Sequence, residues 1–179
     1  MPLRLHESIN GKCTVERKFE EMGDKFVLVD INIEVEGIDT KYQNLSPLHW
    51  RIGDGKNPPL DISVNNHNKI IRGINFFIAD EKILQKDIHI ESSIEKGVPV
   101  FDNELWKNEE YYVDDIGSVR YFQFKNSICC ILSEGKWNLS LELEDNLTLI
   151  FGIDNEVVAI IVECLTAEEI LILEKAHLI

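Results

Sequence analysis

Apolar and polar residues alternate along a stretch near the N-terminus. Within residues 25–36, Val27, Val29, Ile31, Ile33 and Val35 alternate with Leu28, Asp30, Asn32, Glu34 and Glu36. A period of two is typical of a strand with one buried face. The pattern therefore predicts strands over residues 11–21 and 25–36, joined by a hairpin turn at Met22-Gly23-Asp24.

A second hairpin is predicted farther along the chain. Residues 60–64 and 69–79 are apolar runs, and Asn65-Asn66-His67-Asn68 lies between them. Asparagine tolerates the left-handed backbone that a tight turn requires. The stretches on either side of this hairpin are less regular. We expect residues 37–59 to form turns and loop, and residues 81–113, which include Gly97 and Pro99, to form short strands and loops.

From residue 118 the pattern becomes regular again. Short apolar or alternating runs are separated by Asn, Asp, Glu, Gly and Ser, which favour turns. The runs cover residues 118–125, 127–132, 137–143, 147–153 and 157–163. This even spacing predicts an antiparallel meander. Within it, Trp137, Leu139, Leu141 and Leu143 are expected to share one face of their strand.

The last segment has the features of a helix. Thr166 is followed three residues later by Glu169, the spacing of a capping box. Ile170, Leu173 and His177 or Leu178 recur at helical spacing. We expect this helix to pack on the sheet and to cover its edge.

Together these elements predict one mainly β domain over residues 1–179. Its antiparallel sheets are expected to form two layers, as in a β-sandwich, or a curled meander, with a short C-terminal α-helix. The length of 179 residues suits one domain, and the 44% hydrophobic content is that of a folded chain. Whether residues 1–58 complete the same sheet or add a separate layer is left open.

Charge is distributed unevenly along the chain. Residues 76–179 carry 21 acidic and eight basic residues, whereas residues 1–75 carry 11 and 10. An acidic surface repels nucleic acid and anionic membranes and attracts basic partners. We therefore expect no nucleic-acid or membrane partner, although solubility alone would also explain the net charge of −14.

The sequence predicts a cytoplasmic protein. The first residues lack the apolar core of a secretory signal, and no apolar run is long enough to span a membrane. The four cysteines have no zinc-ligand spacing, and each lies in or beside an apolar run. Buried thiols are expected, with the adjacent Cys129 and Cys130 on opposite faces of a strand.

No catalytic or cofactor motif is recognisable. The chain has no glycine-flanked serine elbow, and Gly53-Asp54-Gly55-Lys56 lacks the spacing of a phosphate-binding loop. The five histidines are isolated from one another, so no metal site is predicted. The adjacent carboxylates Glu109-Glu110 and Asp114-Asp115 are an expected result of abundant acids. We expect a protein that is not an enzyme and that holds no cofactor and no metal.

The candidate binding site is an acidic and aromatic segment. Aromatic residues are frequent interface anchors, and carboxylates steer and pair with arginine and lysine. The predicted partner-binding residues are Asp102, Glu104, Trp106, Glu109, Glu110, Tyr111, Tyr112, Asp114 and Asp115. The alternative is that Trp106, Tyr111 and Tyr112 are core residues flanked by solvated acids.

Residues 59–179 resemble a group of small acidic bacterial proteins. The resemblance rests on the hairpin phrase at 59–74, the phrase Gly97-Val98-Pro99-Val100-Phe101-Asp102 and the ending at 151–155 and 165–169. Many such proteins are immunity proteins of contact-dependent growth inhibition and related polymorphic-toxin systems. The resemblance implies a toxin inhibitor that occludes the active site of a cognate toxin with a basic surface. Charge reversal at Glu109, Glu110, Asp114 and Asp115 is then expected to slow association.

Two other functions fit the same sequence. One is a β domain that binds a small molecule or a carbohydrate, with or without hydrolase activity, in a deep pocket lined by Trp50, Trp106 or Trp137. The other is a structural adaptor without a toxin partner. A flat or convex acidic surface would favour immunity over the small-molecule function.

Overall fold

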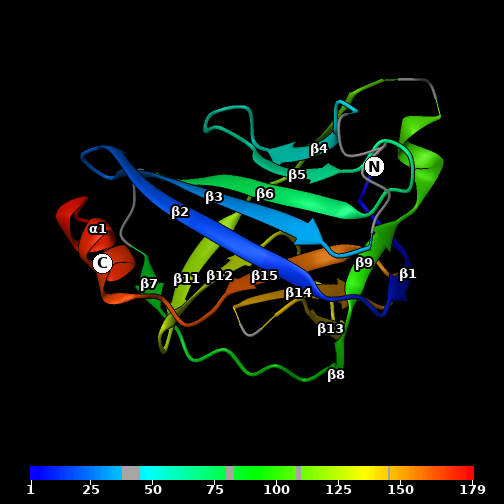
Figure 1. The fold of residues 1–179 in the computed structure, drawn as a ribbon. Helices are drawn as coiled ribbons and strands as arrows, with labels where there is room; N and C mark the ends of the chain where they lie inside the picture. The colour runs from blue at the N-terminus through cyan, green and yellow to red at the C-terminus, as the bar shows by residue number, and fades with distance from the viewer. Residues whose placement is uncertain (38–44, 80–82, 108–109, 145) are drawn as a thin grey trace.

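Two β-sheets packed face to face form the body of the protein in the computed structural model (Figure 1). The structure describes residues 1–37, 45–79, 83–107, 110–144 and 146–179. One sheet has six strands in the order β10 (Tyr112–Ile116), β4 (Leu48–Gly53), β5 (Leu60–Val64), β6 (Ile71–Ala79), β3 (Phe26–Val35) and β2 (Cys13–Gly23). The mainly β fold with two sheet layers is therefore as predicted.

The second large sheet has seven strands. Their order is β7 (Leu84–Gln85), β11 (Arg120–Phe124), β12 (Ser127–Ile131), β15 (Val157–Val162), β14 (Leu147–Gly152), β13 (Trp137–Glu142) and β8 (Ser93–Lys96). The predicted meander holds for β13, β14 and β15 but is wrong at β12, which pairs with β15 instead of β13. Three strand pairs are parallel: β10 with β4, β11 with β7 and β13 with β8.

Smaller elements close the ends of the sandwich. A two-stranded sheet of β1 (Leu5–Ile9) and β9 (Val98–Phe101) lies at one end, followed by the 3-10 helix η2 (Asn103–Trp106). Helix α1 (Ala167–Lys175) lies at the other end beside β2 (Figure 1). The predicted capping box of Thr166 and Glu169 is present, and Leu173 and Leu178 are buried in the main core.

The period-two pattern of β3 places its side chains as predicted. Val27, Val29, Ile31, Ile33 and Val35 are buried in the core between the sheets. The main core also contains residues from both ends of the chain, from Leu3 to Leu178. Strands β2, β3 and β4 belong to the same sheet as β5 and β6, whereas β1 pairs with β9 in the separate two-stranded sheet, so residues 1–58 contribute to both.

A smaller core lies on the outer face of the seven-stranded sheet. The segment that joins β7 to β8 runs along this face and places Ile88 there (Figure 1). Cys129 belongs to this smaller core and Cys130 to the main core, so the two thiols face opposite sides as predicted.

The prediction that Trp137 shares a face with Leu139 is wrong. A β-bulge between these residues shifts the register, because Trp137 pairs with Gly152 whereas Leu139 pairs with Phe151. The extra residue turns Trp137 toward the smaller core, and Leu139 stays against the main core.

The expectation of loop throughout residues 37–59 is also wrong. Strand β4 lies there and buries Leu48, Trp50 and Ile52, while His49 and Arg51 point to the opposite face. The alternation was present in the sequence but covers only a few residues. Residues 38–44 of that stretch are outside the described residues. Among the described residues, no helix has the length and apolar character needed to cross a membrane.

Candidate functional site

The structure divides the predicted acidic and aromatic segment between two elements. Asp102 caps η2, where its side chain accepts a hydrogen bond from the Glu104 backbone at 2.9 Å. The Glu104 carboxylate in turn pairs with Lys107. Tyr112, Asp114 and Asp115 lie on β10, the edge strand of the six-stranded sheet. Glu109 lies outside the described residues.

The aromatic residues of this segment have different environments. Trp106 is only 5% exposed, and its indole Nε1 donates to the His49 carbonyl at 3.4 Å. Tyr111 and Tyr112 are 50% and 54% exposed. Trp106 is therefore a core residue, as the alternative interpretation predicted, whereas Tyr111 and Tyr112 are accessible at the surface.

The acids of β10 are separated by the alternation of the strand. Asp114 lies on the outer face of the sheet beside Arg51, its partner in register on β4. Asp115 points the other way, and its Oδ1 accepts hydrogen bonds from the N-terminal ammonium at 2.8 Å and from the Ile116 backbone at 3.0 Å. The predicted residues that the structure describes do not form one continuous surface.

A compact polar group forms where β10, β4 and β5 meet on the outer face. We call His49, Arg51, Asp61, Tyr112 and Asp114 the outer-face cluster. The His49 ring stacks on Tyr112 with centroids 4.8 Å apart, and Nδ1 of His49 lies 2.8 Å from Oδ1 of Asp61. The Arg51 guanidinium lies 4.8 Å from the centre of the Tyr112 ring. The Tyr112 ring therefore contacts both the His49 ring and the Arg51 guanidinium.

Arg51 and Asp114 form the ion pair of the cluster. Nε and Nη2 of Arg51 donate to the two carboxylate oxygens of Asp114 at 2.7 and 3.0 Å. These hydrogen bonds raise the pKa of Arg51. The Asp114 side chain is still 69% exposed, so it can accept further hydrogen bonds from a partner.

The outer-face cluster ends a polar row that crosses all six strands of its sheet. Neighbouring strands bring these residues directly opposite one another: Lys18, Asp30, Asn75, Asp61, Arg51 and Asp114. Directly opposite side chains lie close enough to interact. An incoming partner would therefore meet the row as one continuous polar strip.

Acids outnumber bases on this outer face. Its carboxylates are those of Glu16, Glu20, Asp30, Glu34, Asp61 and Asp114, and its cations are Lys18, Arg51 and Arg72, the last of which lines a pocket with Glu16 and Glu34. Lys18 already pairs with Glu20 at 2.7 Å, and Arg51 with Asp114. Within the described part of the chain, Glu16, Asp30 and Glu34 have no cation at ion-pair distance. The face can therefore accept cations from outside.

His49, Arg51 and Asp61 were missed because residues 37–59 were expected to be loop. The alternation of Leu48, Trp50 and Ile52 would have placed His49 and Arg51 together on the polar face of a strand. Their proximity to Tyr112 depends on the parallel pairing of β4 with β10, which no local pattern indicates.

A cleft of about 440 Å³ opens between the two sheets, away from the outer-face cluster. Its wall includes Tyr121, whose ring stacks on Phe76 with centroids 5.6 Å apart, and burial raises the pKa of the Tyr121 hydroxyl. Trp50 and Trp106 are buried in the main core, and Trp137 packs on the smaller core. None of the three lines this cleft in the described structure.

A scan of the sequence against models of protein families finds no match, and a search of curated proteins finds no similar sequence.

Proposed function

We propose that this protein binds a basic partner protein across the outer face of its six-stranded sheet. The observation that carries the proposal is the composition of that face, where six carboxylates accompany three cations, of which Lys18 and Arg51 are already paired with carboxylates of the face. A surface with an excess of carboxylates favours partners rich in lysine and arginine.

The proposed biological role is immunity against a toxin. The resemblance of residues 59–179 to immunity proteins supports this role, and so does an acidic binding face, since a toxin that cleaves nucleic acid has a basic active-site cleft. Occlusion of that cleft requires binding groups only. Long-range attraction would accelerate encounter, and the half-exposed Tyr112 ring of the outer-face cluster would slow release.

Affinity capture from the source cells tests this proposal. The tagged wild-type protein is compared with a triple variant, Glu16→Lys, Asp30→Lys and Glu34→Lys. A matched control carries Asp87→Lys, Glu91→Lys and Glu174→Lys, which are exposed acids away from the outer face. We expect the wild type and the control to retain one basic protein that the outer-face variant loses. Equal capture by all three proteins would contradict the proposed face.

A growth assay tests the immunity role itself. The captured protein is expressed alone and together with each of the three forms. We expect arrested growth alone, normal growth with the wild type or the control, and no protection by the outer-face variant. A captured protein that is harmless when expressed alone would leave a binding protein without an immunity role.

The cleft between the sheets supports small-molecule binding as a second candidate function. Its volume of about 440 Å³ is within the range of ligand sites, and its wall combines apolar side chains with the Tyr121 ring. A fragment screen by NMR tests this function. Shifts at Tyr121 that the substitution Val119→Trp abolishes would favour a ligand site there.

A further inference from the structure

Among the described strands, β10 pairs only with β4, so its other edge has no strand partner there. The Tyr111 carbonyl accepts a hydrogen bond from the His49 backbone at 2.7 Å, and the Gly117 backbone donates to the Gly53 carbonyl at 3.1 Å. Odd-numbered residues of β10 therefore turn their backbone groups toward β4. Because these directions alternate along a strand, Tyr112, Asp114 and Ile116 turn theirs away from the sheet.

Most of these outward backbone groups are available to another chain. The Ile116 N–H donates to the Asp115 side chain. Among the described residues, no partner accepts from the N–H groups of Tyr112 and Asp114 or donates to their carbonyls. Such a row of unpaired groups is a template for an added strand.

The side chains beside this edge are suited to an interface. Ile116 is 94% exposed, and Tyr112 and Asp114 precede it on the same outer face at alternate positions. Proteins commonly protect sheet edges with charged side chains, most often lysine, with proline or with a covering element. Strand β10 contains neither lysine nor proline, and its charged residues are Asp114 and Asp115, which repel an acidic strand but attract a basic one.

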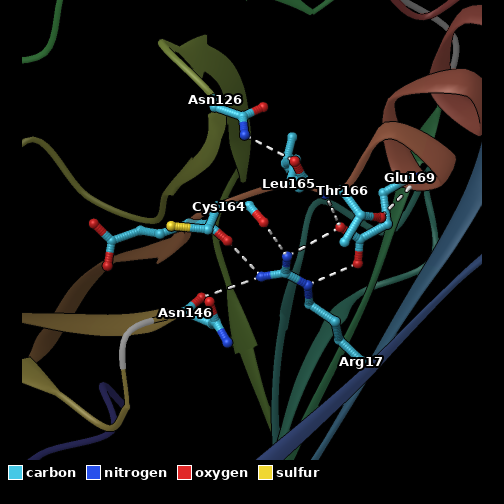
Figure 2. Close-up of polar contacts among 8 residues, drawn as sticks. Arg17, Asn126, Asn146, Cys164, Leu165, Thr166 and Glu169 are labelled. Carbon is cyan, nitrogen blue, oxygen red and sulfur yellow. Dashed lines mark hydrogen bonds and ion pairs between the residues drawn. The ribbon is translucent and has the colours of Figure 1, made fainter.

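The long edge strand of the same sheet is different. Strand β2 contains Lys18, and helix α1 lies beside it, with Glu169 at the start of the helix bonded to Arg17 of the strand (Figure 2). On the other sheet, β8 has an Ile94 that is 62% exposed, but this strand also contains Lys96. Strand β10 therefore has an open edge, an exposed apolar side chain and an exposed carboxylate, and the strand itself contains no lysine.

We infer that the basic partner adds an extended segment to β10 as a further strand of the six-stranded sheet. This inference rests on the proposed function, because it specifies how that partner docks. The segment places an arginine opposite Asp114, with apolar residues two positions away on each side, opposite Tyr112 and Ile116. Backbone hydrogen bonds supply affinity, and these alternate side chains supply specificity.

Arginine suits the central position for a geometric reason. Arg51 already occupies one hydrogen bond on each Asp114 oxygen, and each carboxylate oxygen accepts a second one. A planar guanidinium also stacks on an aromatic face, and the Tyr112 ring lies in the same cluster.

A synthetic peptide tests the inference before the natural partner is identified. The probe is the capped peptide Lys-Val-Thr-Arg-Thr-Val-Lys, titrated into ¹⁵N-labelled protein, and the control peptide has glutamate in place of the arginine. We expect the largest shifts at the amides of β10. We also expect hydrogen exchange at the Tyr112 and Asp114 amides to slow at least about tenfold when they gain acceptors. The glutamate peptide should not bind.

Two substitutions separate β10 from other exposed strands. Ile116→Lys should weaken peptide binding about tenfold or more, since a lysine on the edge repels the basic segment. Ile94→Lys makes the same change on β8 and should leave binding unchanged. Absence of binding at millimolar peptide, or binding that leaves the Tyr112 and Asp114 amides unprotected, would overturn the inference.

The outcomes for the inference and for the proposed function are distinguishable. If capture depends on the outer-face acids while the peptide fails at β10, the partner binds without strand addition and the proposed function stands. If the peptide binds at β10 but the outer-face substitutions do not abolish capture of any protein, the proposed function is wrong. The natural segment that binds β10 would then not belong to a basic partner of the outer face.

Discussion

Arg17 on β2 and Glu169 on α1 form a bidentate ion pair across 152 positions of the chain (Figure 2). Nε and Nη2 of Arg17 lie 2.7 and 3.0 Å from the two carboxylate oxygens, and both side chains are 10% exposed. The same guanidinium donates to the carbonyls of Glu163 and Cys164. Glu169 also accepts from the Thr166 backbone at 2.7 Å. One arginine therefore connects the six-stranded sheet to the cap of the helix.

Replacing Arg17 with methionine should strongly destabilise the fold. The change keeps an apolar stem but leaves a largely buried carboxylate and two carbonyls without their donor. Breaking a buried pair from one side costs about 3–5 kcal/mol. We expect a loss of that order in the free energy of unfolding, measured by urea denaturation. Lys18→Met is the matched control, because the Lys18 and Glu20 side chains are 70% and 47% exposed. Lys18→Met should lower the free energy of unfolding by less than about 1 kcal/mol. Equal losses for the two substitutions would contradict this role of Arg17.

Trp106 and Tyr111 should contribute very differently to stability. Trp106 is buried, so Trp106→Ala should lower the free energy of unfolding by about 3–5 kcal/mol. Tyr111 is 50% exposed, and Tyr111→Ala should change stability by about 0.5 kcal/mol or less. Thermal and urea unfolding measure both effects. A large loss of stability with Tyr111→Ala would show that this side chain belongs to the core.

Thiol reactivity should divide the four cysteines into two groups. Burial raises the pKa of Cys13 to about 11 and of Cys129 to about 12, and it also raises the pKa of Cys130, whereas Cys164 is exposed. At about pH 8 a thiol-specific reagent should titrate Cys164 rapidly in the native protein and the others only after unfolding. Fast labelling of Cys129 in the native state would contradict its burial.

The same shifts predict alkaline destabilisation. A thiol whose folded pKa is raised stays protonated in the native state while the unfolded chain ionises near the ordinary pKa of 9.0. The stability contribution of these thiols is therefore complete below about pH 9 and is lost as pH rises toward about 12. Urea unfolding over this range measures the effect. Replacement of Cys129 by alanine should reduce the slope, and an unchanged slope would assign the pH dependence to other groups.

Charge reversal should slow association more at Asp114 than at the neighbouring Asp115 of β10. Asp114→Lys places a positive charge on the outer face and should slow association with the captured partner about tenfold at low salt. Asp115→Lys should affect association less, because Asp115 points to the other face and binds the N-terminal ammonium. Stopped-flow or biosensor rate constants distinguish the two. Equal slowing would indicate that net charge matters more than the face.

Local patterns in the sequence predicted the elements that one stretch of chain can specify. The alternation from Val27 to Val35 identified β3 and its buried face, and the Thr166–Glu169 spacing identified the start of α1. The polar run from Asn65 to Asn68 identified the turn between β5 and β6. Each signal lies within a few residues, so it does not depend on how the rest of the chain folds.

Other features depended on which strands become neighbours. The pairing of β12 with β15, the bulge that turns Trp137 away from Leu139 and the parallel pairing of β10 with β4 have no local signal. The outer-face cluster results from that last pairing, since His49 and Tyr112 are far apart in sequence and stack only when their strands adjoin. The sequence by itself determined which residues are extended and which faces are apolar, because these properties follow from side-chain periodicity. Tertiary structure decided which polar faces meet, because strand order depends on packing of the whole core.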